Sequence, residues 1–220
     1  MINIDKIEVN VAYSGHITNC YLVYDENNDA ILIDPGYESD KIIEEIRTKR
    51  CHVKYIVITH SHSDHMGALA KVAEYTNAKI IVHVKDLEAL LDKQENYADM
   101  LNVEKQNIDE NIVMTVKDGD TIIAGTLEFE VIHTPGHTAG SICLLEKNSQ
   151  KFFTGDTIFS DCYGRCDLYS GSIDDMAKSL RKVFARFESI MIYPGHGEST
   201  NLSKAKRYIK MLMAMKNIKV

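Results

Sequence analysis

The alternation of apolar and polar residues along the 220-residue chain predicts short strands interleaved with helices. Runs that are apolar, or that alternate with a period of two, predict strands at 2–11, 20–25, 30–34, 53–59, 79–84, 126–133, 141–147, 151–155 and 189–195. Apolar residues at helical spacing predict helices at 39–49, 66–76, 86–92, 173–187 and 202–215. Each of two runs of strands is closed by a helix, a strand and a helix. We therefore expect an α+β fold in which two sheets pack together with helices outside.

Local sequence signals further support two of these predicted helices. The helix at 39–49 follows a turn at 34–36 and has Ile42 and Ile46 on one face. The helix after Ser172 begins with an S-x-x-D pattern, which is typical of a capped N-terminus. Both helices are therefore expected to cover a sheet with one apolar face.

The segment 93–111 is polar and compatible with a helix, and we interpret it as an insertion or a lid-like excursion. No linker rich in Pro, Gly or Ser divides the chain, and no tandem repeat is present. Residues 1–220 are therefore predicted to form a single domain.

The composition excludes several classes of partner. The net charge of −7 without a basic run disfavours a nucleic-acid partner. No run approaches the roughly 18 apolar residues of a membrane span. The first residues, MINIDKIEVNV, carry charges where a signal peptide is apolar. Five cysteines without a C-x-x-C pair indicate reduced thiols and a cytoplasmic location.

Metal-competent side chains follow the ends of five predicted strands. These residues are Asp34, His60, His137, Asp156 and His196. Because strand ends of packed sheets share a rim, we expect these side chains to converge on one cleft.

The stretch THSHSDHMG (59–67) adds further candidate ligands to this rim. A first ion would take three imidazoles and keep a position open for water, with the ligands His60, His62 and His137. A second, more oxygen-rich site would use Asp64, His65 and His196. Asp156 is the candidate bridge between two ions, and Asp34 is expected to orient a ligand histidine through its free N–H.

Other candidates have simpler interpretations. Asp34 could instead be a turn aspartate before Pro-Gly. Cys162 and Cys166 are expected to be reduced bystanders in a loop near the site, with a ligand or redox role as the alternative. The remaining histidines are expected to be structural: His16, His52, His83 and His133.

The motifs together resemble the metallo-β-lactamase superfamily. They are H-x-H-x-D-H (60–65), TPGH (134–137), TGD (154–156) and PGHG (194–197), and they span nearly the whole chain. The resemblance implies an αββα sandwich with a dinuclear site at the edge between the sheets and with the ligands above. TPGHTAGSICLL (134–145), TGDTIF (154–159) and GRCDLYSGS (164–172) are similar to glyoxalase II-like hydrolases, in short forms without a glutathione-binding domain. β-Lactamases of the superfamily usually have a cysteine in the second site, whereas Asp156 stands here, and lactonases share the ligand set.

The first hypothesis is hydrolysis of a small-molecule thioester, such as S-lactoylglutathione, by a hydroxide held between two divalent ions. Zinc is the first choice of metal, with iron or manganese as alternatives. Asp64 is the candidate proton acceptor. Arg165 and Tyr163 are candidate substrate contacts, although Arg165 could instead pair with Asp167.

Two other hypotheses remain open. A mononuclear iron persulfide dioxygenase would use His60, His137 and Asp156. A metal-binding module without activity is the third, although every expected ligand is present.

Overall fold

The computed structural model describes residues 1–11, 15–91 and 106–220. The first sheet has the strand order β1-β2-β3-β4-β5-β6. Its strands are β1 (Asn3–Asn10), β2 (Ile17–Tyr24), β3 (Asp29–Ile33), β4 (His52–Val57), β5 (Lys79–His83) and β6 (Val113–Val116). β1 to β3 pair antiparallel, and β3 to β6 pair in parallel. The carboxyl ends of β3, β4 and β5 therefore lie at one edge of the sheet.

The second sheet has the order β12-β11-β10-β9-β8-β7. Its strands are β7 (Thr121–Ala124), β8 (Leu127–His133), β9 (Ile142–Glu146), β10 (Lys151–Gly155), β11 (Met191–Pro194) and β12 (Thr200–Asn201). All neighbours pair antiparallel except β10 and β11, which are parallel. The ends of β10 and β11 therefore also share an edge.

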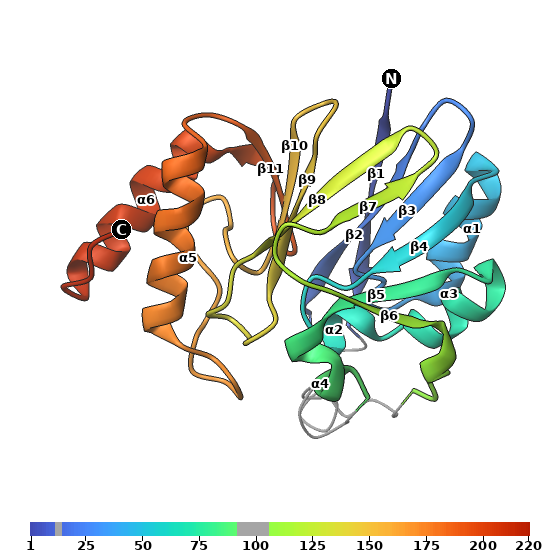
Figure 1. The fold of residues 1–220 in the computed structure, drawn as a ribbon, viewed down its shortest axis with the longest axis horizontal. Helices are drawn as coiled ribbons and strands as arrows, with labels where there is room; N and C mark the ends of the chain where they lie inside the picture. Colours follow the sequence, from blue (N-terminus) through green and yellow to red (C-terminus); the bar gives the residue numbers. More distant parts are fainter. Residues whose placement is uncertain (12–14, 92–105) are drawn as a thin grey trace.

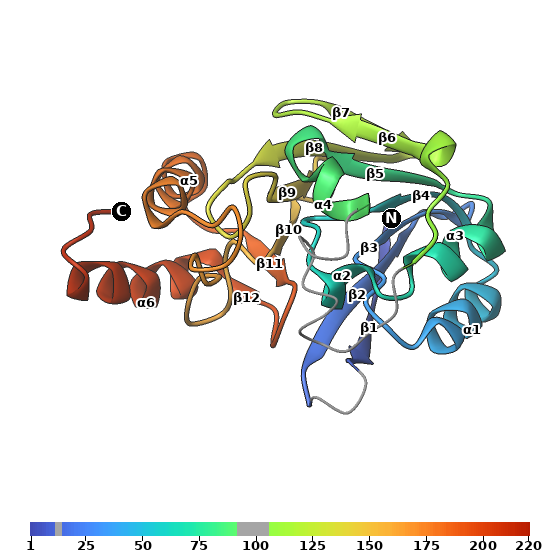
Figure 2. The ribbon, with the colours of Figure 1, turned by 90° about the horizontal axis from the view of Figure 1, so that it is seen from below.

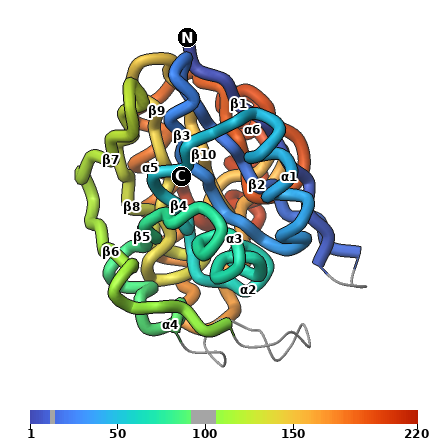
Figure 3. The backbone as a smooth tube through the Cα atoms, turned by 90° about the vertical axis from the view of Figure 1, so that its right-hand side faces the viewer, coloured from blue at the N-terminus to red at the C-terminus, as the bar shows by residue number. Residues whose placement is uncertain are grey.

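Helices cover the outer face of each sheet (Figures 1 and 2). The first sheet carries α1 (Ser39–Lys49), α2 (Ser63–Met66), α3 (Leu69–Thr76) and the short helices η1 (Val84–Asp86), α4 (Leu87–Leu91) and η2 (Glu110–Ile112). The second sheet carries α5 (Ile173–Arg186) and α6 (Leu202–Met215). Viewed from the side of α1 and α3, the two sheets lie behind these helices, with α5 and α6 on the far side (Figure 3).

Three buried apolar clusters fill the spaces between these layers. One joins the first sheet to α1 and α3, with Ile42 and Leu69 as members, and one lies between the sheets around Phe129. The third joins the second sheet to α5 and α6, with Leu180 and Ile209 among its members. The expected αββα sandwich is therefore confirmed.

The structure differs from the sequence prediction at several elements. The helix expected at 66–76 is two helices, α2 and α3. A Cβ at Gly67, between them, would lie 2.4 Å from the carbonyl oxygen of Gly36. At the break, Ala68 N donates to the Pro35 carbonyl (3.0 Å), so the chain leaves the helical hydrogen-bond pattern between α2 and α3. The short strands β6, β7 and β12 were not expected.

Most of the proposed excursion at 93–111 falls outside the described residues. Its described end contains Gln106, whose side chain accepts from Ala70 N (2.7 Å) and donates to the Met66 carbonyl. In the part of the chain that is described, no helix combines the length and apolarity that crossing a bilayer requires.

Candidate metal centre

The candidate ligands lie at the edge between the two sheets, at the carboxyl ends of β3, β4, β8, β10 and β11. Local helix geometry adds the second half of the 59–67 stretch. His62 has an extended backbone and forms the N-cap of α2, which carries Asp64 and His65. One tight turn thus turns four candidate ligands toward the same point.

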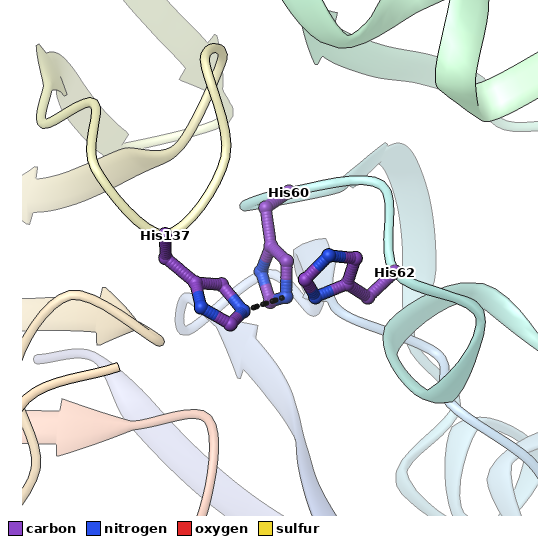
Figure 4. Close-up of side chains that lie close together, drawn as sticks. All are labelled: His60, His62 and His137. Atoms are coloured by element: carbon purple, nitrogen blue, oxygen red, sulfur yellow. Dashed lines mark hydrogen bonds between the residues drawn. The ribbon is translucent and has the colours of Figure 1, made fainter. Parts of the chain in front are cut away.

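The first group of ligands comprises His60, His62 and His137, all buried (Figure 4). One ligand atom from each lies within 4.8 Å of those of the other two. The Nε2 atoms of His60 and His137 are 3.2 Å apart, and the rings of His60 and His62 meet edge to face at 4.7 Å. Three imidazoles from two loops therefore converge as expected for one ion.

The second group comprises Asp64, His65 and His196. The Nε2 atoms of His65 and His196 are 3.2 Å apart, and His196 Nε2 lies 3.3 Å from Asp64 Oδ2. Asp156 lies between the two groups. Its Oδ2 is 3.4 Å from Nε2 of both His137 and His196, and its Oδ1 is 3.4 Å from His65 Nε2. This carboxylate is therefore within reach of both groups at once.

Hydrogen bonds at Nδ1 orient the histidines. His137 Nδ1 donates to the Arg165 carbonyl (2.7 Å), and His196 Nδ1 donates to the Ile17 carbonyl (2.6 Å). Because a carbonyl oxygen can only accept, each ring carries a proton on Nδ1 and turns its Nε2 into the site.

Asp34 orients the rings of His60 and His65 in the same way. Its Oδ2 lies 3.0 Å from His65 Nδ1 and accepts the hydroxyl of Thr59 (2.7 Å). Since the Thr59 hydroxyl donates its hydrogen bond to Asp34, its oxygen can accept a hydrogen bond from His60 Nδ1 at 3.2 Å. The carboxylate thereby turns Nε2 of both His60 and His65 toward the site, as partners of metal-bound histidines commonly do.

These residues fit divalent metal ions. In the first group the Nε2 lone pairs of His60 and His137 face each other at 3.2 Å, which is unfavourable without a cation between them. In the second group His65 and His196 meet at 3.2 Å beside the carboxylates of Asp156 and Asp64. Buried Asp156 Oδ1 accepts no hydrogen bond of good geometry from the described residues. The set of nitrogen and carboxylate donors suits zinc, iron or manganese.

Burial acts against the charged form of each imidazole, and the carboxylate opposes it. Burial lowers the pKa of His62 to about 3, and His137 adds to this effect. Burial would also lower the pKa of His65 and His196, but the carboxylates around them, Asp156 first and Asp64 next, together outweigh it and raise these pKa values to about 10 and about 11. Burial would raise the pKa of Asp156, but His196 and His65 hold it well below its usual range. The carboxylates thus stabilise positive charge on the second group of histidines, at the place where a metal ion would supply it.

A cleft of about 330 Å³ opens over the ligands. Its wall includes Arg165, whose guanidinium makes two 2.8 Å hydrogen bonds to the exposed Asp167 carboxylate, and also His16, Phe159 and Leu168. Sequence reasoning assigned His16 a structural role, and no local signal indicated its place at the cleft.

Tyr163 is not among the described residues that line this cleft. It packs on the core cluster at α5 and α6, and Lys216 Nζ lies 5.5 Å from its ring centre. Cys162 and Cys166 are half-buried free thiols, and burial raises the pKa of each to about 11. Such thiols are poor nucleophiles at neutral pH.

Sequence reasoning also missed two buried residues that hold the ligand loops. Asp86 accepts hydrogen bonds from the loops that carry His60 and His137. Asn19 donates to the carbonyl oxygens of Pro194 and Gly197 (2.9 and 2.8 Å), on either side of His196. Neither has a distinctive local sequence signal.

The geometry agrees with comparisons to known proteins. The chain belongs to the metallo-beta-lactamase superfamily, whose family model matches residues 13–196. It is 30% identical to the hydroxyacylglutathione hydrolase GloC of Haemophilus influenzae over 192 residues, or 86% of this chain and 90% of that protein.

Two crystal structures resemble the fold. That of the BLEG-1 B3 metallo-beta-lactamase has a TM-score of 0.86 at 25% identity, over 96% of this chain and 99% of that one. That of TTHA1623 in a di-iron-bound form has a TM-score of 0.82 at 26% identity, over 94% and 99%. The chain is accordingly an enzyme of this hydrolase superfamily with a His/Asp metal-binding cluster.

Proposed function

We propose that the chain is a dinuclear metal-dependent hydrolase of thioesters, such as S-lactoylglutathione or a related acyl thiol. The observation that carries this proposal is the convergence of oriented Nε2 atoms on Asp156, whose Oδ1 accepts no hydrogen bond from the described residues. The similarity to GloC, a hydroxyacylglutathione hydrolase, supports a thioester substrate.

Two groups of ligands would hold two ions, with Asp156 between them. Zinc is the first choice, and iron or manganese are alternatives, since the relative TTHA1623 was crystallised in a di-iron-bound form. Ions held there would supply Lewis acidity, which lowers the pKa of a water to about 7 and polarises a carbonyl.

The protein's own groups would position the substrate and handle the proton. Burial would raise the pKa of the partly buried Asp64, but His65 and His196 lower it to about 2, so it is an ionised acceptor at neutral pH. Arg165 now pairs with Asp167 at the surface. It would release Asp167 and bind the carboxylate of a substrate in its place. A thiolate is a good leaving group and needs no strong general acid. This agrees with a cleft whose histidines are oriented as metal ligands and not as acids.

The substitution Asp156→Ala tests this proposal. It should abolish thioester hydrolysis and reduce the bound metal from two ions per chain to one or none, as measured by elemental analysis. The matched control is Asp161→Ala, at an exposed aspartate of the same loop, which should keep both. Full retention of metal and activity in Asp156→Ala would overturn the assignment.

A mononuclear iron dioxygenase is the second candidate. His137 Nε2 and His60 Nε2 lie 3.4 and 4.0 Å from Asp156 Oδ2, which is a two-histidine, one-carboxylate set of the kind that iron oxygenases use. Oxygen consumption with glutathione persulfide would favour this function. A lactone and a β-lactam belong in the same substrate panel, because the BLEG-1 enzyme resembles the chain in fold.

We also propose that residues 1–220 act as one domain in the cytoplasm. The apolar cluster between the two sheets supports a single domain, and five free thiols are compatible with a reducing compartment.

A further inference from the structure

One buried carboxylate outside the ligand set connects the two loops that carry the first group of ligands. Asp86, at the end of η1, is 2% exposed. Its Oδ2 accepts from Ser61 N (3.0 Å) and from the Thr138 hydroxyl (2.8 Å), and its Oδ1 accepts from Gly140 N (2.6 Å). Its carbonyl oxygen also accepts the Ser61 hydroxyl at 2.9 Å.

The contacts of Asp86 fall beside particular ligands. Ser61 lies between His60 and His62, and Thr138 directly follows His137. The loop of Ser61 follows a strand of the first sheet, and the loop of Thr138 follows a strand of the second. The Asp86 side chain therefore fixes the distance between these two loops. The fit is close, since a Cβ at Gly140 would lie 2.4 Å from Asp86 Oδ1.

The second group of ligands is held by other residues. His65 is oriented by Asp34 and His196 by the Ile17 carbonyl, while Thr18 lies 3.5 Å from Asp64. Within the described ranges, the hydrogen bonds of the Asp86 carboxylate go to Ser61, Thr138 and Gly140 and not to these anchors. Loss of Asp86 should therefore affect the two groups unequally.

We propose that Asp86 is a positioning residue for the ion held by His60, His62 and His137. This inference rests on the proposed dinuclear site. A carboxylate that accepts three hydrogen bonds makes strong, directional contacts, and it holds the three imidazoles at the mutual distances that one ion requires.

Asp25 is a matched control at the other end of the sandwich. It is also fully buried, and its carboxylate accepts from the backbone N–H of Asn27, Asp29 and Thr126. It therefore connects the two sheets as Asp86 does. It follows β2, whose first residue contacts His196, so the strand separates Asp25 from the metal centre by about 25 Å.

The variants to compare are Asp86→Asn and Asp25→Asn in the full chain. In both aspartates, each of the two carboxylate oxygens accepts a hydrogen bond from a backbone N–H. The asparagine variant replaces one of these oxygens with an NH₂ group, so in either orientation one backbone N–H loses its acceptor. Zinc affinity of the metal-free protein is measured by competition with a chromophoric chelator, and unfolding is followed by circular dichroism. His137→Ala and His196→Ala assign each ion, because each removes a ligand from one group.

Asp86→Asn should lower the affinity for the first ion by about 10–100-fold and keep the affinity for the second ion within about threefold of the wild-type value. Asp25→Asn should lower the unfolding temperature while both ions bind as in the wild type. If Asp86→Asn binds both ions like the wild type, or if Asp25→Asn weakens the first ion equally, the inference is overturned.

Thr138→Val provides a second test if Asp86→Asn does not fold, because it removes one hydrogen bond and keeps the carboxylate. A selective loss of affinity for the first ion supports the inference, and unchanged affinity overturns it. A wild-type chain that binds no zinc would instead overturn the proposed function itself, which keeps the two failures distinct.

Discussion

The side chain of Asn19 connects the loop of His196 to the first sheet, and its removal gives a calculable loss of stability. It is 1% exposed and donates to the Pro194 and Gly197 carbonyls at 2.9 and 2.8 Å. Asn19→Leu keeps the shape of the side chain and removes both donors. We expect this variant to be less stable and to bind the second ion more weakly.

The size of the effect follows from the partners left behind. Each neutral hydrogen bond contributes about 1 kcal/mol, and an unpaired buried carbonyl costs a further 1–3 kcal/mol, approximately. Pro194 O keeps the Tyr21 hydroxyl as a donor at 2.7 Å, and Gly197 is exposed, so water can replace the donor that its carbonyl loses. The free energy of unfolding should therefore fall by about 2 kcal/mol for the two hydrogen bonds lost, which corresponds to roughly 4–8 °C in Tm for a chain of this size.

Urea unfolding of the metal-free protein measures this loss. The control is Tyr21→Phe, which removes one hydrogen bond but leaves Pro194 O paired with Asn19, and it should cost about 1 kcal/mol. The reasoning is refuted if Asn19→Leu lies within about 0.5 kcal/mol of the wild type, or if Tyr21→Phe costs more than Asn19→Leu.

Three further predictions concern pH, backbone conformation and substrate binding. Burial lowers the pKa of His83 from 6.5 to about 4, so the stability due to its neutral ring is present above pH 6.5 and is lost as the pH falls toward 4. Between pH 7 and 4, the free energy of unfolding of metal-free His83→Asn, measured in urea, should fall by about 2 kcal/mol less than that of the wild type. Identical pH profiles of the two proteins would contradict this. Gly136→Ala should cost more than about 3 kcal/mol in thermal unfolding, because φ is 144° and the new Cβ would lie 2.4 Å from Met176 Cα. Gly119→Ala, at φ 84° in open space, should cost only about 1 kcal/mol, and equal losses would count against the argument. Arg165→Gln should raise KM about tenfold for a thioester that carries a carboxylate and leave KM unchanged for one without it; equal KM changes would exclude the contact.

Elements with strong local signals could be predicted from the sequence, and elements fixed by distant contacts could not. The helices expected at 39–49 and 202–215 agree with α1 and α6, because their periodicity is a property of the segment alone. β6 and β7 have four residues each and expose Met114 and Ile123, so they show little alternation of apolar and polar residues.

The candidate ligands could be predicted because each follows the end of a strand and such ends share an edge. The residues that hold them in place could not. Asp86 is 52 residues from Thr138, and Asn19 is 175 residues from Pro194. In the sequence, Asp86 is an ordinary residue near a helix start and Asn19 an ordinary strand residue.

Metal content combined with substrate turnover tests the central claim most directly. The purified protein would be analysed for metal per chain, then assayed with S-lactoylglutathione while thiol release and oxygen are followed together. We expect about two ions per chain and thiol release without oxygen uptake. One iron per chain, with oxygen consumed only when glutathione persulfide is added, would contradict it.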